Sequence, residues 1–95
     1  MENYEIMFIV KPTLEEAAIK DTVKSLETVI TNLKGKVEVK SMGKRELAYP
    51  IKKEISGFYY VFTVNASHDT ISEFDRVARI NENILRHQII KLDEE

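Results

Sequence analysis

The sequence predicts an α+β fold in which two helices cover one face of a four-stranded antiparallel sheet. Four segments show the apolar runs or the period-two alternation that is typical of strands, and two segments show the period of 3.6 that is typical of helices. They follow one another in the order β-α-β-β-α-β, which is that of the split βαβ, or ferredoxin-like, arrangement. A chain of 95 residues has room for one domain, so residues 1–95 are expected to form a single unit.

The first strand and the first helix have the clearest signals. Tyr4 to Val10 is an apolar and aromatic run that ends at Lys11-Pro12, which favours a strand buried on at least one face. Thr13 and Glu16 have the spacing of a capping box, so a helix is expected to begin here. Gly35 suits a left-handed carboxyl cap at its other end. The apolar stripe between them consists of Ile19, Val23, Leu26, Ile30 and Leu33.

The next two strands differ in how they alternate. From residue 36 to residue 51 polar and apolar positions alternate, apart from Met42-Gly43, where a β-bulge is expected because glycine tolerates unusual dihedrals. The polar stretch Lys52 to Gly57 is expected to turn the chain. Phe58 to Asn65 is apolar or aromatic on both faces for much of its length, which favours a central position in the sheet or a face presented to a partner.

A second helix and a last strand complete the pattern. Ser67 or Thr70 is expected to cap a helix that ends at Asn81 and Asn83 and carries the stripe Ile71, Phe74, Val77 and Ile80. Ile84 to Leu92 reads as the last strand, and residues 93–95 form an acidic tail too short and polar to pack. The expected spatial order of the strands is 4-1-3-2, with the first and third strands in the middle and one sheet face left open.

Composition and spacing exclude several classes of protein. No stretch approaches the length of a membrane span, and the start of the chain lacks the basic residues of a signal peptide, so a cytoplasmic protein is expected. The chain has no cysteine, which rules out disulfides and thiolate metal sites. His68 and His87 have no neighbour at ligand spacing, and no nucleophile has a base nearby. Neither a metal, a cofactor nor an enzymatic activity is therefore expected.

Charge is unevenly distributed along the chain. The net charge is −2, but residues 34–53 contain seven basic and two acidic residues, a local charge of +5. The rest of the chain has seven basic and fourteen acidic residues, a charge of −7. Because electrostatic attraction decays over a Debye length of about 8–10 Å, the local charge matters more than the sum. A basic segment of this kind either faces nucleic acid or only keeps an edge strand soluble.

An aromatic motif gives one nucleic-acid signal. The run from Ser56 to Phe62 partly resembles the motif on the third strand of RNA-recognition domains and falls on the third strand of the same topology. The match is incomplete, since Ser56, Tyr59 and Thr63 replace the basic, small and aromatic residues of that motif. Aromatic residues on a central strand more often pack in the core or contact a partner than bind a base, so one of these two roles is expected for Tyr60 and Phe62. A single-strand RNA-binding module that uses them remains the alternative.

The segment from Gly43 to Lys53 gives the second signal. Its basic residues flank the apolar and aromatic run from Leu47 to Ile51. Arginine forks two donors onto phosphate, lysine supplies a point charge, and tyrosine stacks or donates from its hydroxyl. The alternative is a solvated edge strand with Leu47 and Tyr49 packed beneath it and Pro50 blunting the edge.

At this segment the sequence resembles a family, the bacterial small-subunit ribosomal protein numbered six. The resemblance runs the length of the chain and is carried by three stretches: Tyr4 to Pro12, Gly43 to Lys53, and Asn83 to Arg86. Leu47-Ala48-Tyr49-Pro50-Ile51 after two basic residues is its specific signature. One position departs from the pattern, because the family often has tryptophan where this chain has Met42.

The resemblance implies a structural role in the small ribosomal subunit. It implies binding to the central domain of the small-subunit ribosomal RNA, paired with small-subunit ribosomal protein eighteen. Lys44, Arg45 and Arg86 match basic residues typical of the family and are the expected phosphate contacts, and charge alone adds Lys52 and Lys53. The candidates for contact with the partner protein are Leu47, Tyr49 and Ile51.

Overall fold

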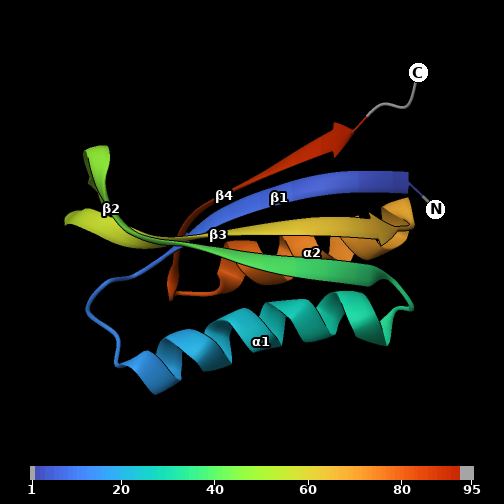
Figure 1. Cartoon of the computed structure of the whole chain (residues 1–95), viewed down its shortest axis with the longest axis horizontal. Helices are drawn as coiled ribbons and strands as arrows, with labels where there is room; N and C mark the ends of the chain where they lie inside the picture. The colour runs from blue at the N-terminus through green and yellow to red at the C-terminus, as the bar shows by residue number, and fades with distance from the viewer. Residues whose placement is uncertain (1, 93–95) are drawn as a thin grey trace.

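The computed structural model describes residues 2–92 (Figure 1). The predicted order of elements is confirmed. The acidic tail expected at residues 93–95 lies outside the described residues. The six elements are β1 (Glu2–Val10), α1 (Glu16–Asn32), β2 (Lys36–Ile51), β3 (Glu54–Ala66), α2 (His68–Ile80) and β4 (Ile84–Leu92).

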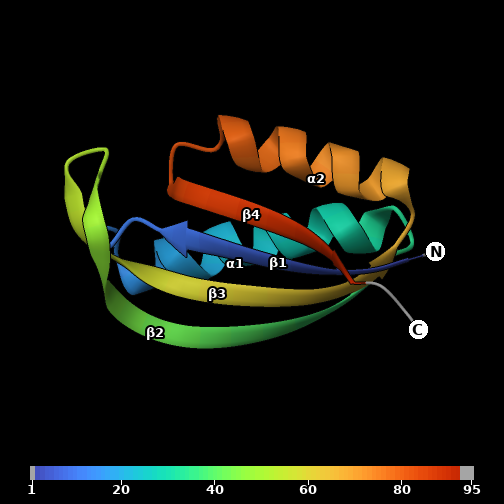
Figure 2. The ribbon, with the colours of Figure 1, turned by 90° about the horizontal axis from the view of Figure 1, so that it is seen from above.

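The four strands form one antiparallel sheet in the order β2-β3-β1-β4, which is the predicted order read from the other edge. Strands β1 and β3 are central, as their apolar composition predicts. In the register, Ile6 lies between Phe62 on β3 and Ile89 on β4. Both helices cover the same face of the sheet, and the opposite face is open (Figures 1 and 2).

The core lies between the sheet and the helices. Alternate residues of β1 point into it, because successive side chains of a strand face opposite sides. Phe8 packs edge-on against Phe62, with ring centroids 5.0 Å apart, and stacks with Tyr60 at 5.6 Å. Phe74 brings α2 onto Phe62 at 6.1 Å. Such aromatic pairs add about 0.5–1.5 kcal/mol each beyond the burial of their area. Phe62 is fully buried in the core, and Tyr60 is partly buried against it.

The ends of α1 differ from the prediction. The helix begins at Glu16 with Glu15 as its N-cap and without a side-chain cap, so the capping box at Thr13 is wrong. At the other end the left-handed residue is Lys34, with φ of 69°, and not Gly35. Hydrogen bonds from Lys34 N to Thr31 O (3.0 Å) and from Gly35 N to Ile30 O (2.9 Å) form a Schellman motif whose C′ position is Lys34.

Gly35 is required by space and not by its dihedral angles. A Cβ at this position would lie 2.7 Å from Cγ2 of Ile30 and 3.0 Å from Cβ of Ala66. The last member of the predicted stripe, Leu33, is 46% exposed, since the helix has ended before it. In α2, Ser67 caps the helix by accepting a hydrogen bond from Thr70 N, which confirms the first of the two predicted caps.

The hairpin between β2 and β3 is longer than predicted. The bulge is confirmed, since the register shifts between Ser41 and Gly43, and Gly43 has a φ of 82°. The long turn predicted from Lys52 to Gly57 is wrong. Only Lys52 and Lys53 form the turn, with φ of 50° and 70°, as in a type I′ turn. That turn matches the twist of the hairpin strands but is normally made by Asn-Gly, so two lysines give no sequence signal for it.

Candidate nucleic-acid interface

The end of the hairpin, here called the hairpin arm (residues 44–57), extends beyond the sheet. Strand β1 ends opposite Phe58, so the arm has only its own two strands. It bends out of the sheet toward the start of β4 (Figure 2). Gly57 allows this close approach, because a Cβ there would lie 2.3 Å from Cγ2 of Ile9. Ile9 and Leu85 are consequently buried at 7% and 5% exposure, outside the main core.

Two hydrogen bonds connect the hairpin arm with β4. Lys52 Nζ donates to the carbonyl of Ile84 at 3.3 Å. Arg86 Nη1 donates to the hydroxyl of Tyr49. These contacts bring Arg86, which is distant in sequence, to the same edge as Lys52 and Lys53. Three of the five predicted RNA-binding residues therefore lie close together.

Lys44 and Arg45 point to opposite sides of the sheet. Lys44 is paired with Phe58, which faces the helices, whereas Arg45 is paired with Gly57 on the open side, beside Ile9. Arg45 Nε donates to the carbonyl of Met42 at 3.2 Å, which turns its side chain back along the strand. Arg45 thus shares the open side with Arg86, and Lys44 does not.

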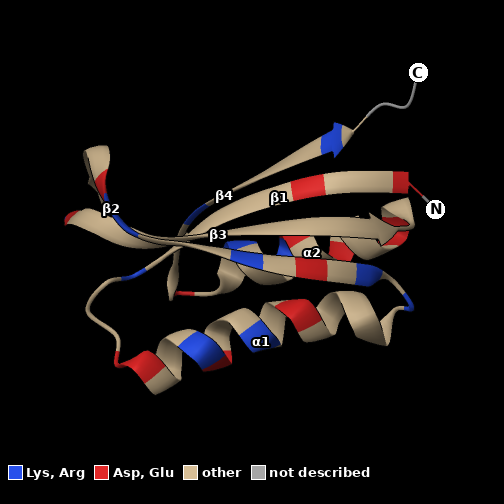
Figure 3. Cartoon of the chain, viewed as in Figure 1, with Lys and Arg blue, Asp and Glu red and all other residues tan. Residues whose placement is uncertain are grey.

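The five predicted cations are exposed and free of carboxylates. Figure 3 shows positive residues along β2 and at the start of β4. Within residues 2–92, the salt bridges involve Arg76, Arg79, His87 and Lys91, and none involves these five. Among the described residues no carboxylate forms a salt bridge with them, so their charges remain available to an external anion. The five are Lys44, Arg45, Lys52, Lys53 and Arg86.

The apolar residues of the hairpin arm are incompletely covered. Tyr49 is 55% exposed, and Leu47 and Ile51 are half-buried. Ile55 is 67% exposed and was missed by the sequence reasoning, which assigned it to a turn. Ile55 lies in β3, which begins at Glu54, whereas the predicted strand began only at Phe58.

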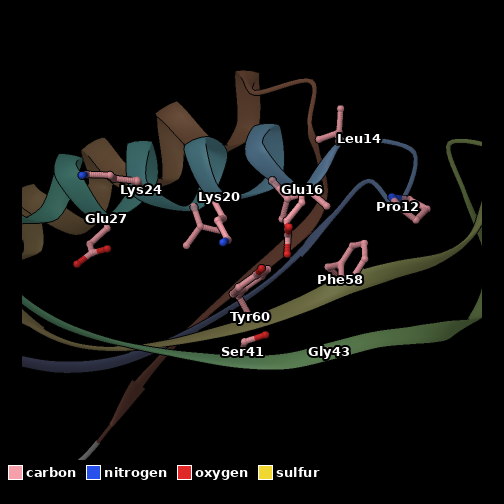
Figure 4. Close-up of a pocket in the computed structure, with 12 residues that line it drawn as sticks. Pro12, Leu14, Glu16, Lys20, Lys24, Glu27, Ser41, Gly43, Phe58 and Tyr60 are labelled. Carbon is pink, nitrogen blue, oxygen red and sulfur yellow. The ribbon is translucent and has the colours of Figure 1, made fainter.

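A groove on the helix side was also missed (Figure 4). It has a volume of about 870 Å³ and runs between α1 and the neighbouring strands β2 and β3. Ser41, on β2 at the edge of the sheet, lines it and is exposed. Its apolar lining is Pro12, Leu14, Ile19, Val23, Phe58 and Tyr60, and its charged lining is Glu16, Lys20, Lys24 and Glu27.

The open face of the sheet has a smaller hollow of about 250 Å³. It is lined by three strands, through Met7, Ile9, Tyr59, Arg86, His87 and Gln88. Tyr59 is the aromatic residue of the β3 motif that faces this side, because Tyr60 and Phe62 face the helices. A base platform made of Tyr60 and Phe62 is therefore not available.

The two histidines contribute no catalytic arrangement. His87 Nε2 lies 2.7 Å from Oδ1 of Asp75, a contact that joins β4 to α2, and Arg79 binds the same carboxylate. In the described part of the chain, no three His, Asp or Glu side chains converge to hold a metal ion. Neither of the two helices there is long and apolar enough to cross a membrane.

The topology and the open sheet define a ferredoxin-like α+β protein. Residues 3–91 match the family described as Ribosomal protein S6. The small ribosomal subunit protein bS6 of Halalkalibacterium halodurans is 47% identical over 96 residues, which cover all of both chains. The chain belongs to the ribosomal protein S6 family. It is a structural component of the small ribosomal subunit, in the cytoplasmic ribosome, and not an enzyme.

Solved structures agree with this assignment. The crystal structure of 30S ribosomal protein S6 from Thermotoga maritima superposes with a TM-score of 0.91 at 31% identity, covering 96% of this chain and 87% of that one. The de novo designed protein Foldit4 superposes with a TM-score of 0.55 at 13% identity, over 98% of this chain and 97% of the design. The second likeness concerns the fold alone.

Proposed function

We propose that the chain binds the central domain of the small-subunit ribosomal RNA through the edge formed by the hairpin arm and the start of β4. The observation that carries this proposal is the cluster of exposed cations that Lys52 and Arg86 bring together through their contacts with β4 and Tyr49. None of them is paired with a carboxylate in the described chain. Each cation that meets a phosphate releases counterions, which favours binding at low salt.

The local charge explains how a net-negative protein binds RNA. The acidic surplus lies outside the basic segment of residues 34–53. The hairpin arm extends beyond the sheet, and screening over about 8–10 Å weakens repulsion from more distant carboxylates. Arginine forks onto phosphate oxygens, so Arg45 and Arg86 are the strongest candidates for such contacts.

We further propose that small-subunit ribosomal protein eighteen occupies the groove between α1 and β2. Two features support this surface. Its floor is apolar, and the side chains of Phe58 and Tyr60 project from the sheet toward α1 (Figure 4). It is also continuous with the hairpin arm, since β2 contributes to both. The partner candidates Leu47, Tyr49 and Ile51 lie on the adjoining arm, where Tyr49 contacts Arg86 on the open side. The acidic remainder of the chain suits a basic partner.

The experiment is to measure the affinity of the chain for the central-domain RNA with and without protein eighteen. The chain alone is expected to bind weakly, since it offers a narrow basic edge. With the partner present, binding is expected to be at least about tenfold tighter, within the usual range of coupling between sites. Equal affinity in both conditions would show that the two proteins do not bind cooperatively.

A further inference from the structure

The hollow on the open face lies directly beside the proposed RNA edge. Arg86 belongs to both, because it lines the hollow and is also held by the Tyr49 hydroxyl of the hairpin arm. Ile9, on the floor of the hollow, is opposite Arg86 on one side and Tyr59 on the other. A nucleotide whose phosphate contacted the edge would therefore have its base next to Tyr59.

Tyr59 lies opposite a glycine on β2. Its partner in the register there is Gly43, and apart from the residues on either side of Gly43 no described atom lies within 4 Å of the point that a Cβ at this position would occupy. Gly43 has a φ of 82°, a backbone conformation that glycine adopts readily and residues with a Cβ rarely adopt. The tyrosine side chain consequently has open space beside it, on the side toward β2.

The lining of the hollow has the chemistry that a nucleobase requires. Met7, Ile9 and the Tyr59 ring are apolar or aromatic, and a base stacks on such surfaces whatever its sequence. Arg86 supplies donors and Gln88 supplies both a donor and an acceptor, which suit the edges of a base. The lining contains no carboxylate that would repel RNA.

We propose that this hollow receives one unpaired nucleobase of the RNA, stacked on Tyr59 and contacted at its edge by Arg86 and Gln88. This inference rests on the proposed RNA binding and adds a site for a single base to it. A protein side chain is the competing occupant. Arg86 forms no salt bridge within residues 2–92 and is continuous with the cationic arm, and both features favour RNA.

The test compares three variants in binding to the central-domain RNA in the presence of protein eighteen. Tyr59→Leu, which removes the ring, is expected to weaken binding by about tenfold or more, the usual effect of losing one stacked base. Tyr59→Phe keeps the ring and is expected to bind as the unchanged chain does. Neither Tyr59 variant changes a charge, so the salt dependence of RNA binding stays the same in both. The third variant, Arg86→Ala, removes a charge and is expected to lower the salt dependence. Photo-crosslinking with thiouridine-substituted RNA is expected to mark the peptide that contains Tyr59.

The outcomes separate this inference from the RNA-binding proposal. If Tyr59→Leu binds RNA normally while Arg86→Ala does not, the base site is wrong and the RNA edge stands. If Tyr59→Leu instead weakens binding to protein eighteen without RNA, the hollow belongs to the protein partner. A Tyr59→Phe variant as weak as Tyr59→Leu would also overturn stacking. If no variant changes RNA binding, the proposed edge itself is wrong.

Discussion

Arg86 on β4 and Tyr49 on the hairpin arm are joined by a hydrogen bond, although 37 residues separate them in the sequence. The guanidinium Nη1 donates and the phenol oxygen accepts. This contact connects a residue expected to bind RNA with a residue expected to bind the partner protein. Tyr49 therefore orients Arg86, and its apolar ring remains 55% exposed for other contacts.

Tyr49→Phe isolates the role of that hydroxyl. The ring stays and the hydrogen bond is lost, which for an exposed pair is worth about 0.5–1 kcal/mol. RNA affinity is expected to fall by roughly twofold to fivefold, with an unchanged salt dependence, because no charge is removed. Filter-binding titrations at several salt concentrations measure both quantities. Wild-type RNA affinity in this variant would show that Tyr49 does not position Arg86 for RNA.

The two-lysine turn combines backbone strain with charge. Lys52 and Lys53 both have positive φ, which disfavours residues with a Cβ. Replacing them by Asn-Gly is expected to raise the free energy of unfolding by about 1 kcal/mol, partly offset by the lost hydrogen bond to Ile84. The salt dependence of RNA binding is expected to fall by about 0.7–0.9 units per lost phosphate contact.

Lys52→Arg with Lys53→Arg is the matched control for this turn, since it keeps both charges and both side chains with a Cβ. It is expected to change neither the free energy of unfolding nor the salt dependence. If the Asn-Gly variant were more stable but bound RNA with an unchanged salt dependence, Lys52 and Lys53 would not be part of the RNA interface. Chemical denaturation and RNA titration together make the distinction.

The end of α1 gives a prediction about stability alone. Lys34→Gly relieves the left-handed backbone and is expected to stabilise the fold by about 1 kcal/mol. Gly35→Ala places a methyl group against Ile30 and Ala66 and is expected to destabilise it by about 1–3 kcal/mol. Urea denaturation measures both. If Lys34→Gly instead destabilised the fold while Gly35→Ala also did so, the left-handed residue would be Gly35, as the sequence predicted.

The groove is tested by filling it. Ser41 lines the groove and is exposed, so Ser41→Tyr is expected to leave the fold intact and to weaken binding of protein eighteen by tenfold or more, about 1.4 kcal/mol. Thr63→Tyr adds the same side chain on the opposite sheet face and serves as the control. Calorimetry with the purified partner measures both variants. The reverse pattern would place the partner on the open face.

Periodicity predicted the fold well because the patterns of strands and helices are set by burial. The order of the elements and the central position of β1 and β3 both followed from it. Local backbone signals were less reliable. Glycine marked the bulge correctly at Gly43 and the helix end incorrectly at Gly35, since space and not dihedral preference selects Gly35.

The interface could be predicted from the sequence only in part. Local charge identified the basic segment, and the family resemblance added Arg86. No pattern indicated that Tyr49 holds Arg86, because this contact depends on the twist of the hairpin arm and its bend toward β4. The groove was missed for a similar reason. Its lining combines α1 with β2 and β3, which only the folded arrangement brings together.

The central claim, that the hairpin arm and the start of β4 form the RNA edge, is tested most directly by the salt dependence of RNA binding. Arg45→Ala with Arg86→Ala removes two charges from that edge. Arg76→Ala with Arg79→Ala removes two charges from α2, where both arginines are paired with carboxylates. We predict that the first double variant lowers the slope by about 1.4–1.8 units and that the second leaves it unchanged. Equal slopes for the two variants would contradict the account.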